Sequence, residues 1–154
     1  MAAGSGFTAA ADASISRTIV GVTSGAYSTP STNGMYAGCF NTQFTAAAKA
    51  GATEWTTASD GSYARQQMGV STAFGWSIAA YVNSTGVVWN NSNTITFPAV
   101  TLNNQSLAAL GWIDVVTLGS GNINFFYDLS AALSVNIGSN VILNPSTGAV
   151  FTTY

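Results

Sequence analysis

The chain has 154 residues, of which 5% are charged, and its formal net charge is −2. This length fits one domain with a sizeable core, and the single cysteine, Cys39, excludes a disulfide within the chain. Three basic residues cannot neutralise a run of phosphates and no run of about 20 apolar residues is present, so we expect neither nucleic-acid binding nor a membrane span.

The first predicted element is an amphipathic helix over residues 7–22. Phe7, Ile15, Ile19 and Val22 recur at helical spacing, which places them on one face of the helix. That face can fold back on its own domain, or the helix can be an arm that docks on a neighbouring subunit. The periodicity is the same in both cases, so both alternatives stay open.

Residues 28–154 change from the helical pattern to short extended segments, so an N-terminal helix or arm over residues 1–27 precedes a β domain. The strands are expected at residues 35–40, around 62–70, at 73–82, at 94–97, at 110–116 within the stretch 106–118, at 141–143 and at 149–154. The last two are expected to pair as a hairpin. Short strands separated by turn-forming residues predict a mostly β, antiparallel, jelly-roll-like β-sandwich with one N-terminal amphipathic helix.

Residues 123–137 carry the clearest strand pattern, because apolar and polar side chains alternate along them. Strict period two indicates an extended chain with one buried face. We expect Tyr127 and Leu129 on the buried face, and Asn124 and Asp128 on the polar face. A run this long is either two strands or one long bent strand, since most strands have about 5–6 residues.

The sequence contains few of the residue types and motifs that enzymes use in catalysis. The absence of histidine removes the commonest general base and most transition-metal sites. Asp114 and Asp128 could in principle form an acid/base pair of the glycosidase type, although structural roles fit both better. Gly119-Ser120-Gly121 lacks the lysine of a phosphate-binding loop and is typical of a hairpin turn. We therefore expect no enzymatic activity, no cofactor and no metal.

Arg65 is expected to be structural. It lies in a segment with half-buried strand character, and a buried guanidinium requires a carboxylate partner. Asp114, in another predicted strand, is the candidate partner for a structural Arg65–Asp114 ion pair.

Several short strings follow one another in a recognisable order after Glu54. These are Gly61-Ser62-Tyr63-Ala64-Arg65-Gln66, Ile95-Thr96-Phe97-Pro98, Gly111-Trp112-Ile113-Asp114 and Leu143-Asn144-Pro145-Ser146-Thr147-Gly148. In this order and at these spacings, over nearly the whole chain, they resemble small tailed-bacteriophage virion proteins of the tail-fibre-like or capsid decoration (cement) type.

This resemblance implies a structural virion protein without enzymatic activity. A capsid cement protein that stabilises the shell is the preferred interpretation, with a tail-fibre or tail-adaptor component as the alternative. The implied partners are the major capsid protein and copies of the chain itself, in a trimer. The expected location is the capsid surface or the tail of the virion, after synthesis in the host cytoplasm, since residues 1–6 lack the features of a signal peptide.

A carbohydrate-binding module is a further hypothesis from a different class. Four Trp and six Tyr residues could supply sugar-binding surfaces on a β domain. Core packing and interface anchoring are the commoner uses of these side chains and are preferred here.

Overall fold

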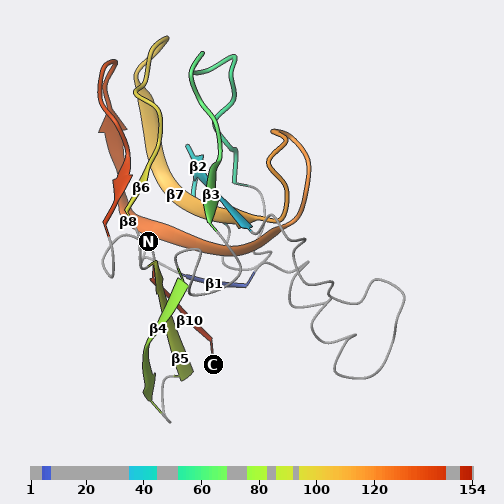
Figure 1. The fold of residues 1–154 in the computed structure, drawn as a ribbon. Helices are drawn as coiled ribbons and strands as arrows, with labels where there is room; N and C mark the ends of the chain where they lie inside the picture. Colours follow the sequence, from blue (N-terminus) through green and yellow to red (C-terminus); the bar gives the residue numbers. More distant parts are fainter. Residues whose placement is uncertain are drawn as a thin grey trace.

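The computed structural model describes residues 5–7, 35–44, 52–68, 76–82, 86–91, 94–144 and 150–153. This described part consists of β-strands and connecting segments, with no helix in it (Figure 1). The strands are β1 (Ser5–Phe7), β2 (Met35–Phe40), β3 (Gln66–Met68), β4 (Trp76–Val82), β5 (Gly86–Asn91), β6 (Ile95–Thr96), β7 (Gln105–Ile113), β8 (Ile123–Val135), β9 (Ile142–Leu143) and β10 (Val150–Thr153). The predicted mostly β class is therefore confirmed for these residues.

The strands form three antiparallel sheets. The largest has the order β1-β8-β7-β2-β3, a second has the order β10-β5-β4, and β6 pairs with β9 in a third. Figure 1 shows β7 and β8 as two long curved strands side by side, with β4, β5 and β10 grouped at the lower end of the view. The antiparallel arrangement agrees with the sequence, whereas the jelly-roll-like sandwich stays a prediction.

The boundaries of several strands follow the sequence closely. The strand predicted at residues 35–40 is β2, with the same bounds. The turn predicted at residues 119–121 connects β7 to β8, and Gly119 and Gly121 have φ angles of 75° and 86° there. These angles lie in the left-handed region that glycine enters without steric cost.

The predicted C-terminal hairpin is wrong. The strand at residues 142–143 pairs with β6, where Leu143 lies opposite Ile95. The strand at residues 150–153 pairs instead with β5, where Phe151 lies opposite Trp89. Proximity along the chain favours a hairpin, but here both strands find partners from earlier in the sequence.

The predicted N-terminal helix cannot be compared in full. Phe7 belongs to β1, which pairs with β8, and Phe7 lies opposite Phe125. Ile15, Ile19 and Val22 lie outside the described residues, so the rest of the helix, and its role as a docking arm, stays a prediction.

The hydrophobic core covers both faces of the largest sheet. Along β7, Leu110 and Trp112 belong to one buried cluster, whereas Ala109 and Ile113 belong to the other. Alternating residues of a strand point to opposite faces. A central strand covered on both sides is therefore apolar at nearly every position, as β7 is.

Strand β8 is one long bent strand, which was one of the two predicted alternatives. Leu107 of β7 lies opposite Leu133, whereas Ala109 lies opposite Asp128. Two steps along β7 thus correspond to five steps along β8, so β8 carries extra residues between these two pairs. Such a bulge bends the strand and increases its twist.

The predicted burial of β8 is wrong in its first half. Asn124, Phe126 and Asp128 are buried, whereas Tyr127 and Leu129 are half-buried. The physical reason is that both faces of this half are covered by the two clusters. Alternation between apolar and polar residues therefore does not separate a core face from a solvent face.

Candidate interaction surface

The Arg65 side chain is buried and paired, as expected, but not with Asp114. Its Nε donates to Glu54 Oε1 at 2.7 Å, and its Nη2 donates to Glu54 Oε2 at 2.6 Å. The two parallel bonds match the fork geometry of a guanidinium on a carboxylate. The predicted Arg65–Asp114 pair is therefore wrong in its partner.

Asp114 has a local role at the base of the hairpin between β7 and β8. Its carboxylate accepts hydrogen bonds from the Asn122 backbone N–H at 2.8 Å and from the Asn122 side-chain amide at 3.0 Å. The sequence signal for this role is the short distance along the chain to Asn122. Polar residues flanking a glycine-containing turn commonly bond to nearby backbone groups.

Arg65 also holds the turn of this hairpin. Its Nη1 donates to the carbonyl oxygens of Val115 at 2.8 Å, Thr117 at 2.8 Å and Ser120 at 3.0 Å. One guanidinium thus ties Glu54, at the isolated bridge beside β2, to residues 115–120. The hairpin turn is attached to the body of the protein by this side chain.

Tyr63 and Cys39 complete the buried polar group around Glu54. The Tyr63 hydroxyl donates to Glu54 Oε1 at 2.9 Å and accepts from the Cys39 backbone N–H at 2.9 Å. Burial, with the charge of Glu54 as a second cause, raises the pKa of the Cys39 thiol well above its ordinary value. A thiol held in its neutral form is a poor nucleophile and a poor metal ligand.

Two further carboxylates are buried and structural. Asp60 accepts hydrogen bonds from the backbone N–H and the hydroxyl of Thr101, at 2.8 and 3.1 Å. Burial acts to raise the pKa of Asp60, but these and other hydrogen bonds outweigh it, so the pKa is lowered. Asp128 accepts from the Phe44 N–H at 2.9 Å, and burial raises its pKa.

The structure does not bring Asp114 and Asp128 together. Asp128 lies opposite Ala109 and Asp114 follows Ile113, so about five residues of β7 separate them. At about 3.3 Å per residue the separation is roughly 16 Å, well beyond the spacing of paired glycosidase carboxylates. Among the described residues, no group of three or more His, Cys, Asp or Glu side chains is arranged to hold a metal ion.

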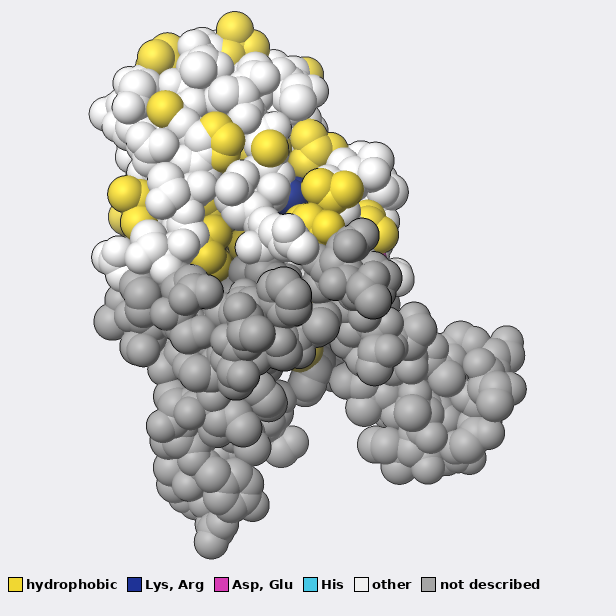
Figure 2. All heavy atoms as spheres, viewed as in Figure 1, with side chains coloured by type: hydrophobic (Ala, Val, Ile, Leu, Met, Phe, Trp, Pro, Cys, Tyr) yellow, Lys and Arg dark blue, Asp and Glu magenta, His cyan; other side chains and the backbone are white. Residues whose placement is uncertain are grey.

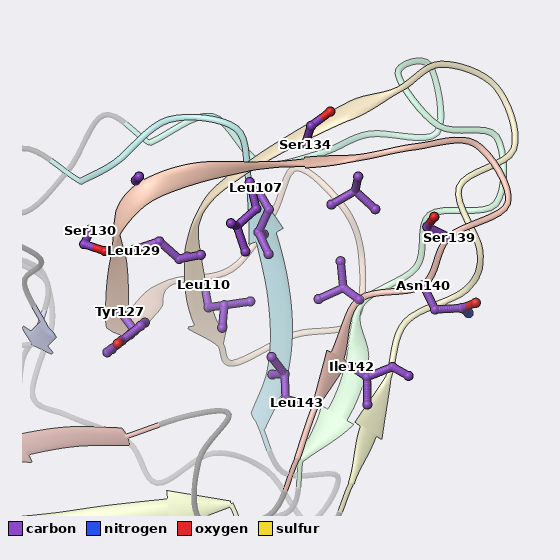
Figure 3. Close-up of a pocket in the computed structure, with 14 residues that line it drawn as sticks. Leu107, Leu110, Tyr127, Leu129, Ser130, Ser134, Ser139, Asn140, Ile142 and Leu143 are labelled. Carbon is purple, nitrogen blue, oxygen red and sulfur yellow. The ribbon is translucent and has the colours of Figure 1, made fainter.

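An open groove of about 680 Å³ lies on the concave side of the bent strand β8. Its walls come from β7, from β8 and from the segment that leads into β9 (Figure 3). The lining residues are Leu107, Leu110, Tyr127, Leu129, Ser130, Ala131, Leu133, Ser134, Val135, Ser139, Asn140, Val141, Ile142 and Leu143. None of these side chains is charged, and most of them are aliphatic.

The segment that follows β2 holds β8 at its bulge. The Gln43 side-chain amide donates to the Leu129 carbonyl oxygen, and the adjacent Phe44 N–H bonds to Asp128. The Phe44 ring packs on Phe126 with a centroid distance of 4.8 Å. These contacts fix the position at which β8 bends over the groove.

The sequence did not predict the groove or the Glu54 partnership. A bulge depends on the relative lengths of two paired strands, which no short motif encodes. In the sequence, Glu54 stands out only because it precedes the segment Tyr63–Arg65.

The surface view shows apolar side chains scattered among uncharged polar ones, with one small Lys or Arg area visible on the described part of this face (Figure 2).

Residues 8–150 match the family model of the podophage GP4 fiber I protein gp80. The match defines the class of the protein, which is a fibre-like structural protein of the phage virion. The chain belongs to this gp80 family, because the match covers nearly all of its sequence. No curated protein matches the chain. No helix in the described residues is long and apolar enough to cross a membrane.

Proposed function

We propose that the chain is a non-enzymatic subunit of the virion's fibre that acts by binding other protein surfaces, including copies of itself. Its membership of the gp80 fibre family carries this proposal. The uncharged groove supports a protein-binding role, because burying aliphatic groups is favourable and burying hydroxyl groups costs far less than burying ions.

Capsid cement is the second candidate role. It is favoured by the described strands, which form short sheets and include no long shaft-like element. The family is a fibre family, so we place the fibre first and the cement role second. In the cement role the partner would be the major capsid protein. In the fibre role it would be other tail components.

A homotrimer is the assembly that we propose for the chain. Closed cyclic symmetry is the usual way in which identical subunits bury matching patches. Nucleic acid and membranes are not proposed as partners. Arg65 is buried in an ion pair, and Arg17 and Lys49, outside the described residues, leave little positive charge for a phosphate surface.

Glycan binding is a weaker alternative. Sugar sites commonly place aromatic faces beside hydrogen-bonding groups, and the groove has one aromatic residue, Tyr127, among mostly aliphatic side chains. The Asn140 amide is already engaged with the Phe97 carbonyl oxygen at 2.9 Å. The lining therefore favours a protein surface over a sugar.

Immunogold electron microscopy of purified particles tests the proposed location. An antibody against this chain should label fibres that project from the tail. Label spread over the capsid would support the cement role instead, and an absence of label from intact and disrupted particles would contradict both roles.

A further inference from the structure

We propose that the groove beneath the bend of β8 receives a second copy of this chain. The inference rests on the proposed self-association and adds the surface through which the copies meet. The groove, its exposed aliphatic rim and a run of exposed, uncharged residues of β8 coincide at this corner of the molecule.

The rim of the groove carries exposed aliphatic side chains. Leu133 is 54% exposed and Ile142 is 53% exposed, and both line the groove. Ile137, which is 56% exposed, is not a lining residue but lies between these two along the chain. Within the described residues, only two other large apolar side chains, Leu102 and Val116, are more than half exposed. Such clustering of apolar surface marks an interaction site, whereas single exposed residues do not.

Among the described residues, no strand pairs with residues 130–134 of β8 on the side away from β7. Residues 130–134 are five consecutive exposed positions, with the uncharged sequence Ser-Ala-Ala-Leu-Ser. On the side away from β7, the described pairing of β8 is with β1, and it ends at Tyr127 opposite Ser5. This stretch includes the bulge, so it offers exposed and uncharged side chains that a second chain can cover.

The charge pattern favours a second copy as the occupant. All 14 side chains that line the groove are uncharged, so an occupant with charged side chains would have to bury them without partners. An ordinary protein surface is rich in Lys, Arg, Asp and Glu, but only 5% of this chain is charged. Its own surface is thus the complementary one.

Light scattering on purified full-length chain tests the proposal with variants of matched exposure. Leu133→Glu and Ile142→Glu each place a charge on the rim, and Val116→Glu places the same charge on the hairpin turn, where the native side chain is 57% exposed. Ala131→Trp blocks the groove by size alone, in case a charge in β8 impairs folding. Circular dichroism melts confirm that each variant is folded.

We expect the wild type and Val116→Glu to be oligomeric at about 10 μM, and the three groove variants to associate at least about tenfold more weakly. Groove variants that assemble like the wild type would overturn the proposed surface and leave self-association intact. A monomeric wild type would overturn self-association itself. Dissociation of Val116→Glu to the same extent would also overturn the assignment to the groove.

Discussion

Arg65 and Glu54 form a two-point ion pair in the interior of the protein. The bonds measure 2.7 Å from Nε to Oε1 and 2.6 Å from Nη2 to Oε2, and the Arg65 side chain is 2% exposed. The same carboxylate accepts from Tyr63, so the Tyr63–Arg65 string and the glutamate that precedes it meet at one point. The remaining guanidinium donors hold the hairpin turn between β7 and β8.

Replacing Arg65 with methionine should lower the free energy of unfolding by about 3–5 kcal/mol, because Glu54 would then lie in the interior without a counter-ion. The carbonyl oxygens of Val115, Thr117 and Ser120 would also lose their hydrogen bonds from Arg65. Urea unfolding measures the loss, and hydrogen exchange should show faster opening of residues 114–122.

The control for this change is Asp114→Asn. An asparagine oxygen can still accept from the Asn122 N–H, so we expect a cost below about 1 kcal/mol. A cost for Asp114→Asn as large as that for Arg65→Met would contradict the assignment of Glu54 as the partner of Arg65.

Asp128→Asn should gain stability relative to the wild type as the pH rises from acidic to neutral. Burial raises the pKa of Asp128 in the folded state above its unfolded value of about 3.9. Below that value the carboxyl is neutral in both states. As the pH rises through the folded-state pKa, the unfolded chain ionises more readily and this residue lowers wild-type stability.

Urea unfolding at about pH 3 and about pH 7 measures this effect of Asp128. The stability of Asp128→Asn relative to the wild type should rise between the two pH values, because asparagine cannot ionise but can still accept from Phe44. If the stability of Asp128→Asn relative to the wild type stays constant or falls between the two pH values, burial does not destabilise the ionised carboxylate of Asp128.

Neighbouring phenylalanines test the burial of β8. Phe126→Ala should cost about 3–5 kcal/mol, since Phe126 is buried and packs on Phe44. Phe125→Ala should cost less, because Phe125 is half-buried on the opposite face. Chemical denaturation measures the loss of unfolding free energy in both variants. A larger loss for Phe125→Ala than for Phe126→Ala would instead support the burial that the alternating pattern predicts.

The two glycines of the hairpin turn offer a matched pair. Gly119→Ala should cost about 1–2 kcal/mol for the left-handed backbone alone, since no atom lies near the added methyl. Gly121→Ala should cost a further 1–3 kcal/mol or so, because its methyl would lie 2.4 Å from Val115 Cγ2 and 2.6 Å from Asp114 Oδ1. Thermal unfolding of both variants checks the difference, and equal costs would contradict the close packing around Gly121.

Local features of the fold could be predicted from the sequence. Strand β2 and the turn at residues 119–121 follow from strand-forming side chains and paired glycines, which act within a few residues. Strand pairing is not local, so proximity along the chain favoured a C-terminal hairpin where β9 pairs with β6. Alternation along β8 was a poor guide because both faces of its first half are covered.

The candidate site was harder to predict for the same reason. A buried guanidinium requires a carboxylate, and this requirement correctly indicated that Arg65 is paired. The choice between Glu54 and Asp114 depends on which segments the sheet brings together. The groove depends on the extra residues of β8 and on the Gln43 and Phe44 contacts that hold its bend, and neither has a sequence signature.

Quantitative mass spectrometry of purified virions tests the central claim most directly. The measured quantity is the ratio of this chain to the major capsid protein and to the tail components of the same particle. The fibre assignment predicts a copy number close to that of the tail components and far below that of the major capsid protein. Absence from the virion, or a copy number comparable to that of the major capsid protein, would contradict it.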